Sequence, residues 1–205
     1  IFTPKGFIID IQKLSKIELF KIKKNLNKFI IKPNKSGSSY GIVIIKNNSD
    51  LNMFCKRLNS YKKNFSLNDE LLIEEFISGK ELTVSTIKLQ NKITALAVTQ
   101  INTKNNFFDY KAKYSKGYAR HILPAKLGKK NYNNCLHLAT KCHLLLGCNS
   151  VARTDFIYNV AKNKFYFLET NTQPGLTPIS LLPEQAKYRN LSFLDIILIM
   201  LKNLN

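Results

Sequence analysis

The sequence is poor in acidic residues and in arginine. Its 13 aspartates and glutamates stand against 32 basic residues, all but four of which are lysines, and the formal charge is +19. Such an excess first suggests a nucleic acid or an anionic membrane as partner. The lysines are scattered, however, with no stripe of interleaved aromatics, and lysine, asparagine and isoleucine share A/T-rich codons. We therefore interpret the charge as a solvated surface and expect neither nucleic acid nor membrane as partner.

No C-x-x-C pair occurs, which argues against the common zinc and redox motifs. The cysteines are Cys55, Cys135, Cys142 and Cys148. Cys135 and Cys142 fall at helical spacing with Leu138 and Leu145, so we predict one buried apolar stripe rather than metal ligands. Buried free thiols are typical of a reducing cytoplasm, where we expect the protein.

Long apolar runs and a signal peptide are also missing. The longest apolar run, Phe193 to Leu201, is interrupted by Asp195 and is too short to span a bilayer. An apolar fraction of 44% with 11% aromatics is nevertheless typical of a globular protein with a sizeable core. Because the chain begins at Ile1 rather than at methionine, we expect it to be part of a longer protein.

Residue patterns predict an α+β chain with antiparallel sheets. Helices are expected at 15–27, at 49–60, at 132–146 and from 192 onward, after the capping residues Ser15, Ser49 and Ser192 and before Gly147. Strands are expected at 29–32, 42–45 and 71–74, and two hairpins at 81–100 and 151–171. Residues 102–128 are polar, aromatic and aperiodic, and so long a segment without its own structure is usually functional or disordered.

The second hairpin carries the strongest chemical signal. Arg153 and Asp155 share one face of its first strand, and Glu169 and Asn171 share one face of its second. If the register brings these faces together, oxygen ligands suited to Mg²⁺ lie beside a guanidinium that could neutralise a phosphoryl group. The alternative is an exposed polar face. Strongly apolar neighbours favour a partly buried site, and they are Phe156, Phe165, Phe167 and Leu168.

Three further segments have weaker signals. The segment from Lys32 to Gly41 contains small residues whose backbone can approach a phosphate, although an ordinary turn explains it equally well and it matches no P-loop. Acidic residues at the end of the 71–74 strand could accept hydrogen bonds from adenine and ribose, or could be exposed acids. The Lys- and Tyr-containing segment 109–114 could close over a bound phosphate.

Five motifs, in this order, resemble the D-alanine–D-alanine ligase family of the ATP-grasp fold: IIKPNKSGSSYG, LLIEEFISGKELTV, FFDYKAKY, ARTDF and FLETNTQPGLTPISLLPEQA. The last is close to the family's signature, and the match covers nearly the whole chain. The resemblance implies two α+β subdomains with antiparallel sheets that enclose ATP. Residues 1–73 would form the central lid subdomain and residues 74–205 the catalytic subdomain.

The resemblance also implies roles for individual residues. Lys32 and Lys113 would contact the ATP phosphates, and Ser38 and Ser39 would belong to the phosphate and substrate loop. Glu74 and the segment Glu75–Ile77 would meet the adenine, and Glu81 the ribose. Two Mg²⁺ ions, replaceable by Mn²⁺, would be bound by Asp155, Glu169 and Asn171. Arg153 and the backbone of Gly175 would hold the oxyanion of the tetrahedral state, Tyr114 would orient the substrate, and Ser180 and Leu181 would hold the carboxylate of the second D-alanine.

The implied reaction is phosphorylation of one D-alanine by ATP, followed by attack of a second D-alanine on the acylphosphate, for peptidoglycan precursor synthesis. The family's usual homodimer is the expected assembly. Lys111 replaces the family's usual acid and Tyr40 its usual valine. The family's N-terminal domain, which supplies a glutamate and a histidine, is missing from this sequence. A D-alanine–D-lactate ligase and a non-catalytic remnant are therefore kept as alternatives, although Tyr114 favours dipeptide formation.

Overall fold

The structure is a computed structural model that describes residues 1–37, 40–103 and 119–203. Contacts divide these residues into two compact units. We call residues 4–77 the N-terminal unit, and residues 1–3, 78–103 and 119–203 the C-terminal unit. The predicted boundary after residue 73 falls inside a strand. The division lies after Ile77 because the amides of Glu75 and Phe76 donate to the carbonyls of Lys5 and Lys28, within the N-terminal unit.

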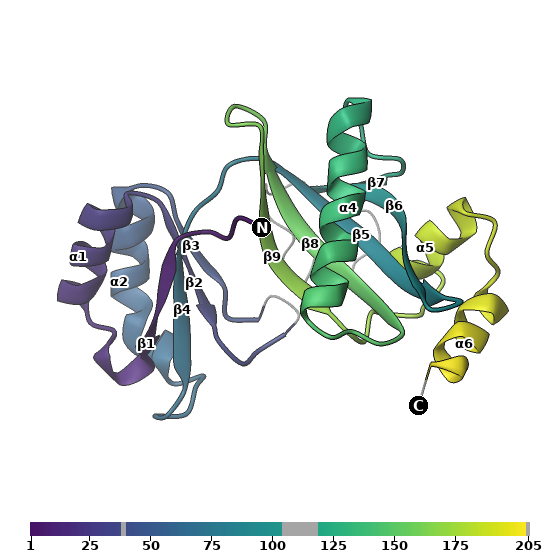
Figure 1. The fold of residues 1–205 in the computed structure, drawn as a ribbon. Helices are drawn as coiled ribbons and strands as arrows, with labels where there is room; N and C mark the ends of the chain where they lie inside the picture. The colour runs from purple at the N-terminus through teal and green to yellow at the C-terminus, as the bar shows by residue number, and fades with distance from the viewer. Residues whose placement is uncertain (38–39, 104–118, 204–205) are drawn as a thin grey trace. The chain divides into compact units, whose positions relative to one another are not determined.

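The N-terminal unit is an antiparallel four-stranded sheet with its helices on one face (Figure 1). The sheet order is β1-β4-β2-β3, formed by β1 (Gly6–Asp10), β4 (Glu70–Glu75), β2 (Phe29–Pro33) and β3 (Val43–Ile45). The helices are η1 (Ile11–Lys13), α1 (Lys16–Leu26) and α2 (Asn48–Lys62). Phe29, Ile31 and Ile73 pack with α1 and α2 residues in the core, so the next residues along β2 and β4 lie on the opposite face.

Local side-chain chemistry sets where α1 and α2 begin. Ser15 Oγ accepts a hydrogen bond of 3.1 Å from the amide of Glu18, as the capping pattern predicts. The cap predicted at Ser49 is wrong. Asn47 accepts from the amide of Asp50, and the Asp50 carboxylate accepts from the Asn47 amide, so a complete capping box starts the helix two residues earlier.

The C-terminal unit is an antiparallel five-stranded sheet with helices on both faces. The sheet order is β7-β6-β5-β8-β9, formed by β7 (Ala119–Ile122), β6 (Lys92–Thr103), β5 (Lys80–Leu89), β8 (Val151–Asn159) and β9 (Lys164–Asn171). Helix α4 (Lys129–Leu145) packs on the face that carries Leu82 and Phe156 (Figure 1). Helices α5 (Leu181–Tyr188) and α6 (Phe193–Lys202) pack with Ile87 and Val151, which point to the other face.

Both predicted hairpins are confirmed, but β1, β7 and α5 were not predicted. Strand β7 lies within the segment 102–128 that had no periodic pattern. Helix α4 starts three residues before the predicted residue 132 and Gly147 follows it with a φ of +63°, as expected of a glycine after a helix. Ser192 and Asp195 form the capping box of α6.

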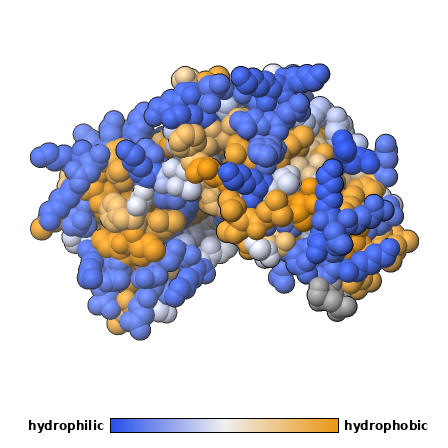
Figure 2. Space-filling model, viewed as in Figure 1, coloured by the Kyte–Doolittle hydropathy of each residue, from blue (hydrophilic) through white to orange (hydrophobic). Residues whose placement is uncertain are grey.

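The cysteine prediction is largely confirmed. All four are free thiols, and Cys148 alone is not fully buried. Cys135 and Cys142 lie in the core beneath α4, but Leu145 is 67% exposed, so the predicted stripe ends one turn early. Among the residues that the structure describes, no helix is both long and apolar enough to cross a membrane. Hydrophilic residues spread over the visible surface of both units, with apolar patches between them (Figure 2).

Candidate functional site

The β8–β9 hairpin brings its four polar residues together on the face opposite α4. Arg153 lies opposite Asn171 and Asp155 lies opposite Glu169 in the strand register. A β-bulge follows at once, because Phe156 pairs with Phe167 and leaves Leu168 as an extra residue. The bulge allows Glu169 to point toward the polar face while Phe167, two residues earlier, packs with Phe156 against α4.

Asp155 is held from two sides. Arg153 donates from Nε to Oδ1 at 3.0 Å and from Nη2 to Oδ2 at 2.9 Å, which is a bidentate ion pair. From the neighbouring strand, the hydroxyl of Thr83 donates to Oδ1 at 2.5 Å. Only 13% of the Asp155 side chain and 14% of the Arg153 side chain are exposed. The carboxylate and the guanidinium are therefore fixed before any ligand arrives.

Further acids surround this ion pair. Burial lowers the pKa of Arg153, but Asp155 and, more weakly, Glu169 and Glu81 raise it, and the net effect is a raised pKa. Glu81 shares a face with Thr83, since the two lie two residues apart on β5. Among the described residues, these three acidic side chains outnumber the guanidinium that they surround, and this negative charge favours a bound cation.

The oxygen donors suit Mg²⁺, which accepts water and phosphate ligands, better than a metal ion that needs all of its ligands from protein side chains. Asp155, Glu169 and Asn171 offer two carboxylates and one amide oxygen, which are hard ligands. The Asn171 Oδ1 already accepts a hydrogen bond of 2.9 Å from the amide of Gln173 but has a second lone pair. Within 1–37, 40–103 and 119–203, no group of three or more histidines, cysteines, aspartates or glutamates is placed to hold a metal. Mg²⁺ commonly completes such a partial set with water and phosphate oxygens.

The loop after β9 approaches the start of α5 closely. A Cβ added to Gly175 would lie 2.8 Å from Ser180 Oγ, so only glycine fits there without a shift. Ser180 Oγ accepts from the amide of Thr177 at 3.2 Å and lies 2.8 Å from the Thr177 hydroxyl. Leu181 is 6% exposed, so it would contact a ligand through its backbone rather than through its side chain.

The N-terminal unit carries a second group of predicted residues. Lys32 and Glu74 lie on the sheet face opposite α1 and α2 and form an ion pair with side chains 23% and 12% exposed. Glu75 Oε1 accepts a hydrogen bond of 2.9 Å from the amide of Lys5, and Ile77 is half-buried at the end of this unit. The Lys32 ammonium is therefore already near an acid rather than isolated.

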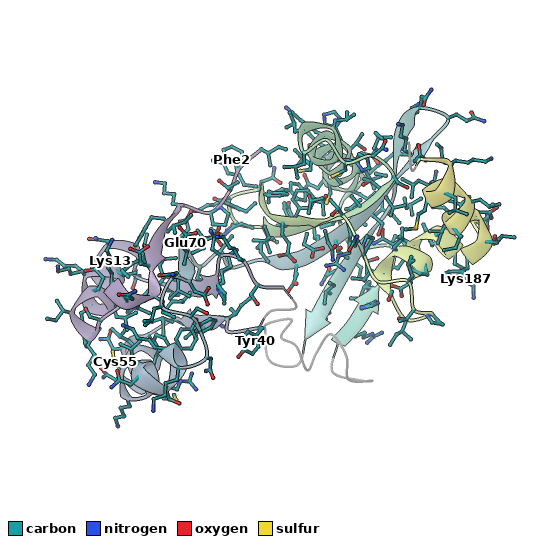
Figure 3. The ribbon with its side chains drawn as sticks, turned by 90° about the horizontal axis from the view of Figure 1, so that it is seen from below. Phe2, Lys13, Tyr40, Cys55, Glu70 and Lys187 are labelled. Atoms are coloured by element: carbon teal, nitrogen blue, oxygen red, sulfur yellow. The ribbon has the colours of Figure 1, made fainter. Side chains whose placement is uncertain are left out.

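The loop after β2 depends on a glycine. Gly41 has a φ of +69°, and an added Cβ would lie 2.7 Å from the Phe65 ring. Tyr40, labelled in Figure 3, packs on Phe65 with ring centroids 6.1 Å apart, so the replacement of the family's valine is accommodated here. The other predicted loop residues lie outside the described residues, and they are Ser38, Ser39, Lys111, Lys113 and Tyr114.

Two residues that support this site, Thr83 directly and Gln185 through Thr83, were not predicted from the sequence. Thr83 binds Asp155 directly, and its place two residues after Glu81 on an alternating strand is a signal that could have identified it. Gln185 lies in α5, is fully buried and bonds to β5. No local pattern separates Gln185 from an ordinary helix surface residue.

Comparison with known proteins gives one consistent family. Residues 10–202 match the model of the family described as D-ala D-ala ligase C-terminus. A D-alanine–D-alanine ligase from Caulobacter sp. (strain K31) is 39% identical over 80% of this chain and 50% of its own length. The ligase of Wolbachia pipientis wMel is 33% identical over 99% of this chain and 60% of its own. The crystal structure of the VanG D-Ala:D-Ser ligase from Enterococcus faecalis superposes with a TM-score of 0.78 at 25% identity, over 98% of this chain and 57% of that one.

Proposed function

Because the chain belongs to the D-alanine–D-alanine ligase C-terminal family, we propose that it supplies the catalytic part of an ATP-dependent ligase that joins two D-alanines. Its two α+β units with antiparallel sheets have the ATP-grasp fold of these ligases. The chain spans about half the length of the curated relatives that it matches. The observation that carries the proposal is the pairing of Asp155 with Glu169 beside a buried, fixed Arg153.

In the proposed reaction, a carboxylate oxygen of the first D-alanine attacks the γ-phosphorus of ATP, and the bond to the ADP oxygen breaks. The amine of the second D-alanine then attacks the acylphosphate carbon, loses a proton, and inorganic phosphate leaves. Arg153 would keep its positive charge near the oxyanion, because Asp155 fixes two of its three donor nitrogens, Nε and Nη2. The backbone of Gly175 is the second proposed oxyanion contact.

Asp155, Glu169 and Asn171 would hold two Mg²⁺ ions, or Mn²⁺ in their place. When bound, these ions would supply positive charge to the phosphate oxygens. Lys32 and Lys113 would contact the phosphates with the Ser38–Ser39 loop, and Lys32 would then exchange its ion pair with Glu74 for a phosphate contact. The remaining proposed contacts are Glu74 and Glu75–Ile77 to adenine, Glu81 to ribose, and Ser180 and Leu181 to the second carboxylate.

The units themselves would divide the work. The N-terminal unit would act as the lid over the nucleotide and the C-terminal unit would carry the chemistry. A homodimer in the cytoplasm, without a nucleic-acid partner, is the proposed working state, and the four free thiols agree with a reducing compartment.

An isotope experiment with the intact protein tests this proposal. D-Alanine labelled with ¹⁸O in its carboxylate should transfer one labelled oxygen to the released phosphate, because that oxygen forms the bond to phosphorus. Mass spectrometry should detect D-alanyl-D-alanine in equal amount. Phosphate release without label would exclude the acylphosphate. Parallel reactions with D-lactate and D-serine as the second substrate identify the acceptor, and no release in any reaction would indicate a non-catalytic protein.

A further inference from the structure

Gln185 is a fully buried polar residue on α5. Its Oε1 accepts a hydrogen bond of 2.7 Å from the amide of Ser85, and its Nε2 donates to the carbonyl of Thr83 at 3.1 Å and to Thr99 Oγ1 at 2.9 Å. The carboxamide is therefore satisfied on both ends, by strands β5 and β6. Lys187, two residues later and labelled in Figure 3, is exposed on the same helix.

These bonds are made at an irregularity of the sheet. The register between β5 and β6 shifts between Val84 and Thr86, so Ser85 lies opposite two residues of β6, Leu96 and Ala97, instead of one. At this irregularity the Ser85 amide donates to the side chain of Gln185. An unpaired buried amide would be costly, so the shift and the glutamine stabilise each other.

The same stretch of β5 holds the acid of the proposed metal site. Thr83, whose carbonyl accepts from Gln185, donates its hydroxyl to Asp155 Oδ1. At its other end, α5 begins with Ser180 and Leu181. One side chain thus connects the helix that begins at the proposed acceptor contacts to the strand that fixes the Asp155 carboxylate.

We propose that Gln185 is a positioning residue for this site: it ties α5 to the register shift of β5 and, through Thr83, sets the position of the Asp155 carboxylate. This role rests on the proposed ligase function. Gln185 itself touches no substrate in this account. Its effect is transmitted by one backbone carbonyl and one hydroxyl.

The first test needs no ligand and measures amide hydrogen exchange in the intact protein. In Gln185→Met, which conserves side-chain volume, the Ser85 amide should exchange at least about tenfold faster, since its acceptor is removed. Asn203→Leu is the matched control, because Asn203 Nδ2 donates to the Lys88 carbonyl on the same strand from beyond α6. That variant should leave Ser85 exchange unchanged. Equal Ser85 exchange in Gln185→Met and the unmodified protein would overturn the proposed contact.

The second test is a double-mutant cycle on the Mg²⁺ dependence of ligation. Gln185→Met and Thr83→Val should each raise the Mg²⁺ concentration for half-maximal rate about fivefold, the effect expected of one lost hydrogen bond. Together they should raise it less than the roughly 25-fold of independent effects, because both act on Asp155. Thr83→Ser keeps the hydroxyl and should restore the Mg²⁺ concentration for half-maximal rate to that of the unmodified protein. Asn203→Leu should lower thermal stability but leave that Mg²⁺ concentration unchanged.

The outcomes separate the two proposals. If the unmodified protein is active and Gln185→Met changes the Mg²⁺ dependence no more than Asn203→Leu does, only the role of Gln185 is overturned. Independent effects in the cycle do the same. A protein without D-alanine-dependent turnover overturns the ligase function and this role with it. Should Gln185→Met fail to fold, Gln185→Glu retains an acceptor for the Ser85 amide but loses the bond to the Thr83 carbonyl, so it should still raise the Mg²⁺ requirement, and an unchanged Mg²⁺ dependence would overturn the role.

Discussion

Asp155 and Glu169 face each other across the β8–β9 ladder, at the last regular pair before the bulge at Leu168. Asp155 is held by Arg153 and Thr83, whereas Glu169 is exposed. One carboxylate is thus fixed and the other is free to adjust. A pair of this kind suits a site that must accept both a metal ion and the phosphate group that arrives with it.

Glu169→Gln in the intact protein should abolish D-alanine-dependent phosphate release. The substitution keeps the shape of the side chain but removes a charge that would help to hold the two metal ions, which should weaken their binding. Steady-state phosphate release at increasing Mg²⁺ measures the effect. Glu18→Gln on α1, where the Glu18 carboxylate lies 3.6 Å from the Lys21 ammonium, is the control and should be active. Near-normal turnover of Glu169→Gln at saturating Mg²⁺ would contradict the metal assignment.

Tyr114→Phe should retain the fold and ATP binding but select the second substrate less well. The resemblance implies that its hydroxyl orients the substrate within a closed loop, and one lost hydrogen bond costs about 1 kcal/mol. D-Lactate should then compete better with D-alanine as acceptor. The measurement is the ratio of dipeptide to depsipeptide formed near neutral pH. An unchanged ratio would show that the hydroxyl plays no part in selection.

The positive charge should not produce specific affinity for nucleic acid. Binding to duplex DNA should be weak and should vanish as salt rises to physiological strength, because it depends on scattered lysines and counterion release alone. Fluorescence anisotropy with a labelled duplex over a salt series measures this. Sub-micromolar affinity at physiological salt would revive the nucleic-acid interpretation.

Stability should fall at alkaline pH partly because of Cys142. Burial raises its pKa to about 11 from the ordinary 9.0, so the neutral thiol favours the folded state. This contribution is complete below pH 9 and is lost as the pH rises through 11. Between about pH 8 and about pH 10.5, the free energy of unfolding measured in urea should therefore fall by about 2 kcal/mol less in Cys142→Ala than in the unmodified chain. Equal losses would mean that the thiol is solvated in the folded state.

Ser192→Ala should destabilise α6 and the core cluster that contains Ile196 and Ile199. Ser192 Oγ accepts from the amide of Asp195 at 3.1 Å, and removal of such a cap costs about 1 kcal/mol. Thermal unfolding measures the loss. Ser60→Ala, at an exposed position within α2, is the matched control and should be neutral or slightly stabilising. Equal melting temperatures for the two variants would rule out the cap as a source of stability.

The elements that could be predicted are those with local causes. The two hairpins and the caps at Ser15 and Ser192 depend on residues close together in the sequence and were placed correctly, whereas the cap of α2 was placed at Ser49 instead of Asn47. Helix α5 was not predicted, although its Pro183 lies in the first turn, where the missing N–H of proline removes no helical bond. Strands β1 and β7 are short and depend on partners outside their own segments, because β1 pairs with Glu70–Glu74 and β7 pairs with Gln100–Thr103.

The residue types of the candidate site could be predicted from the sequence, but the bulge and the buried residues that position them could not. Alternation along β8 placed Arg153 and Asp155 on one face, but the register that brings Glu169 and Asn171 opposite them was left open by the sequence. Alternation along β9 would also place Phe167 on the face of Glu169, and the bulge at Leu168 reverses that. Gln185 could not be identified from the sequence, because its partners include the Ser85 amide and the Thr83 carbonyl. Backbone groups are the same in every residue, so they leave no sequence pattern that would indicate such a contact.

The extra residue at Leu168 also bears on how related sequences should align. Each residue added to or removed from β9 after the bulge would exchange the two faces, turning Glu169 or Asn171 toward the packing of α4. The turn at 160–163 joins the strands far from that point, so its length is under no such constraint. Alignment gaps in this hairpin should therefore fall at 160–163 or at residue 168, and a gap within 169–171 should mark a relative that has lost the chemistry.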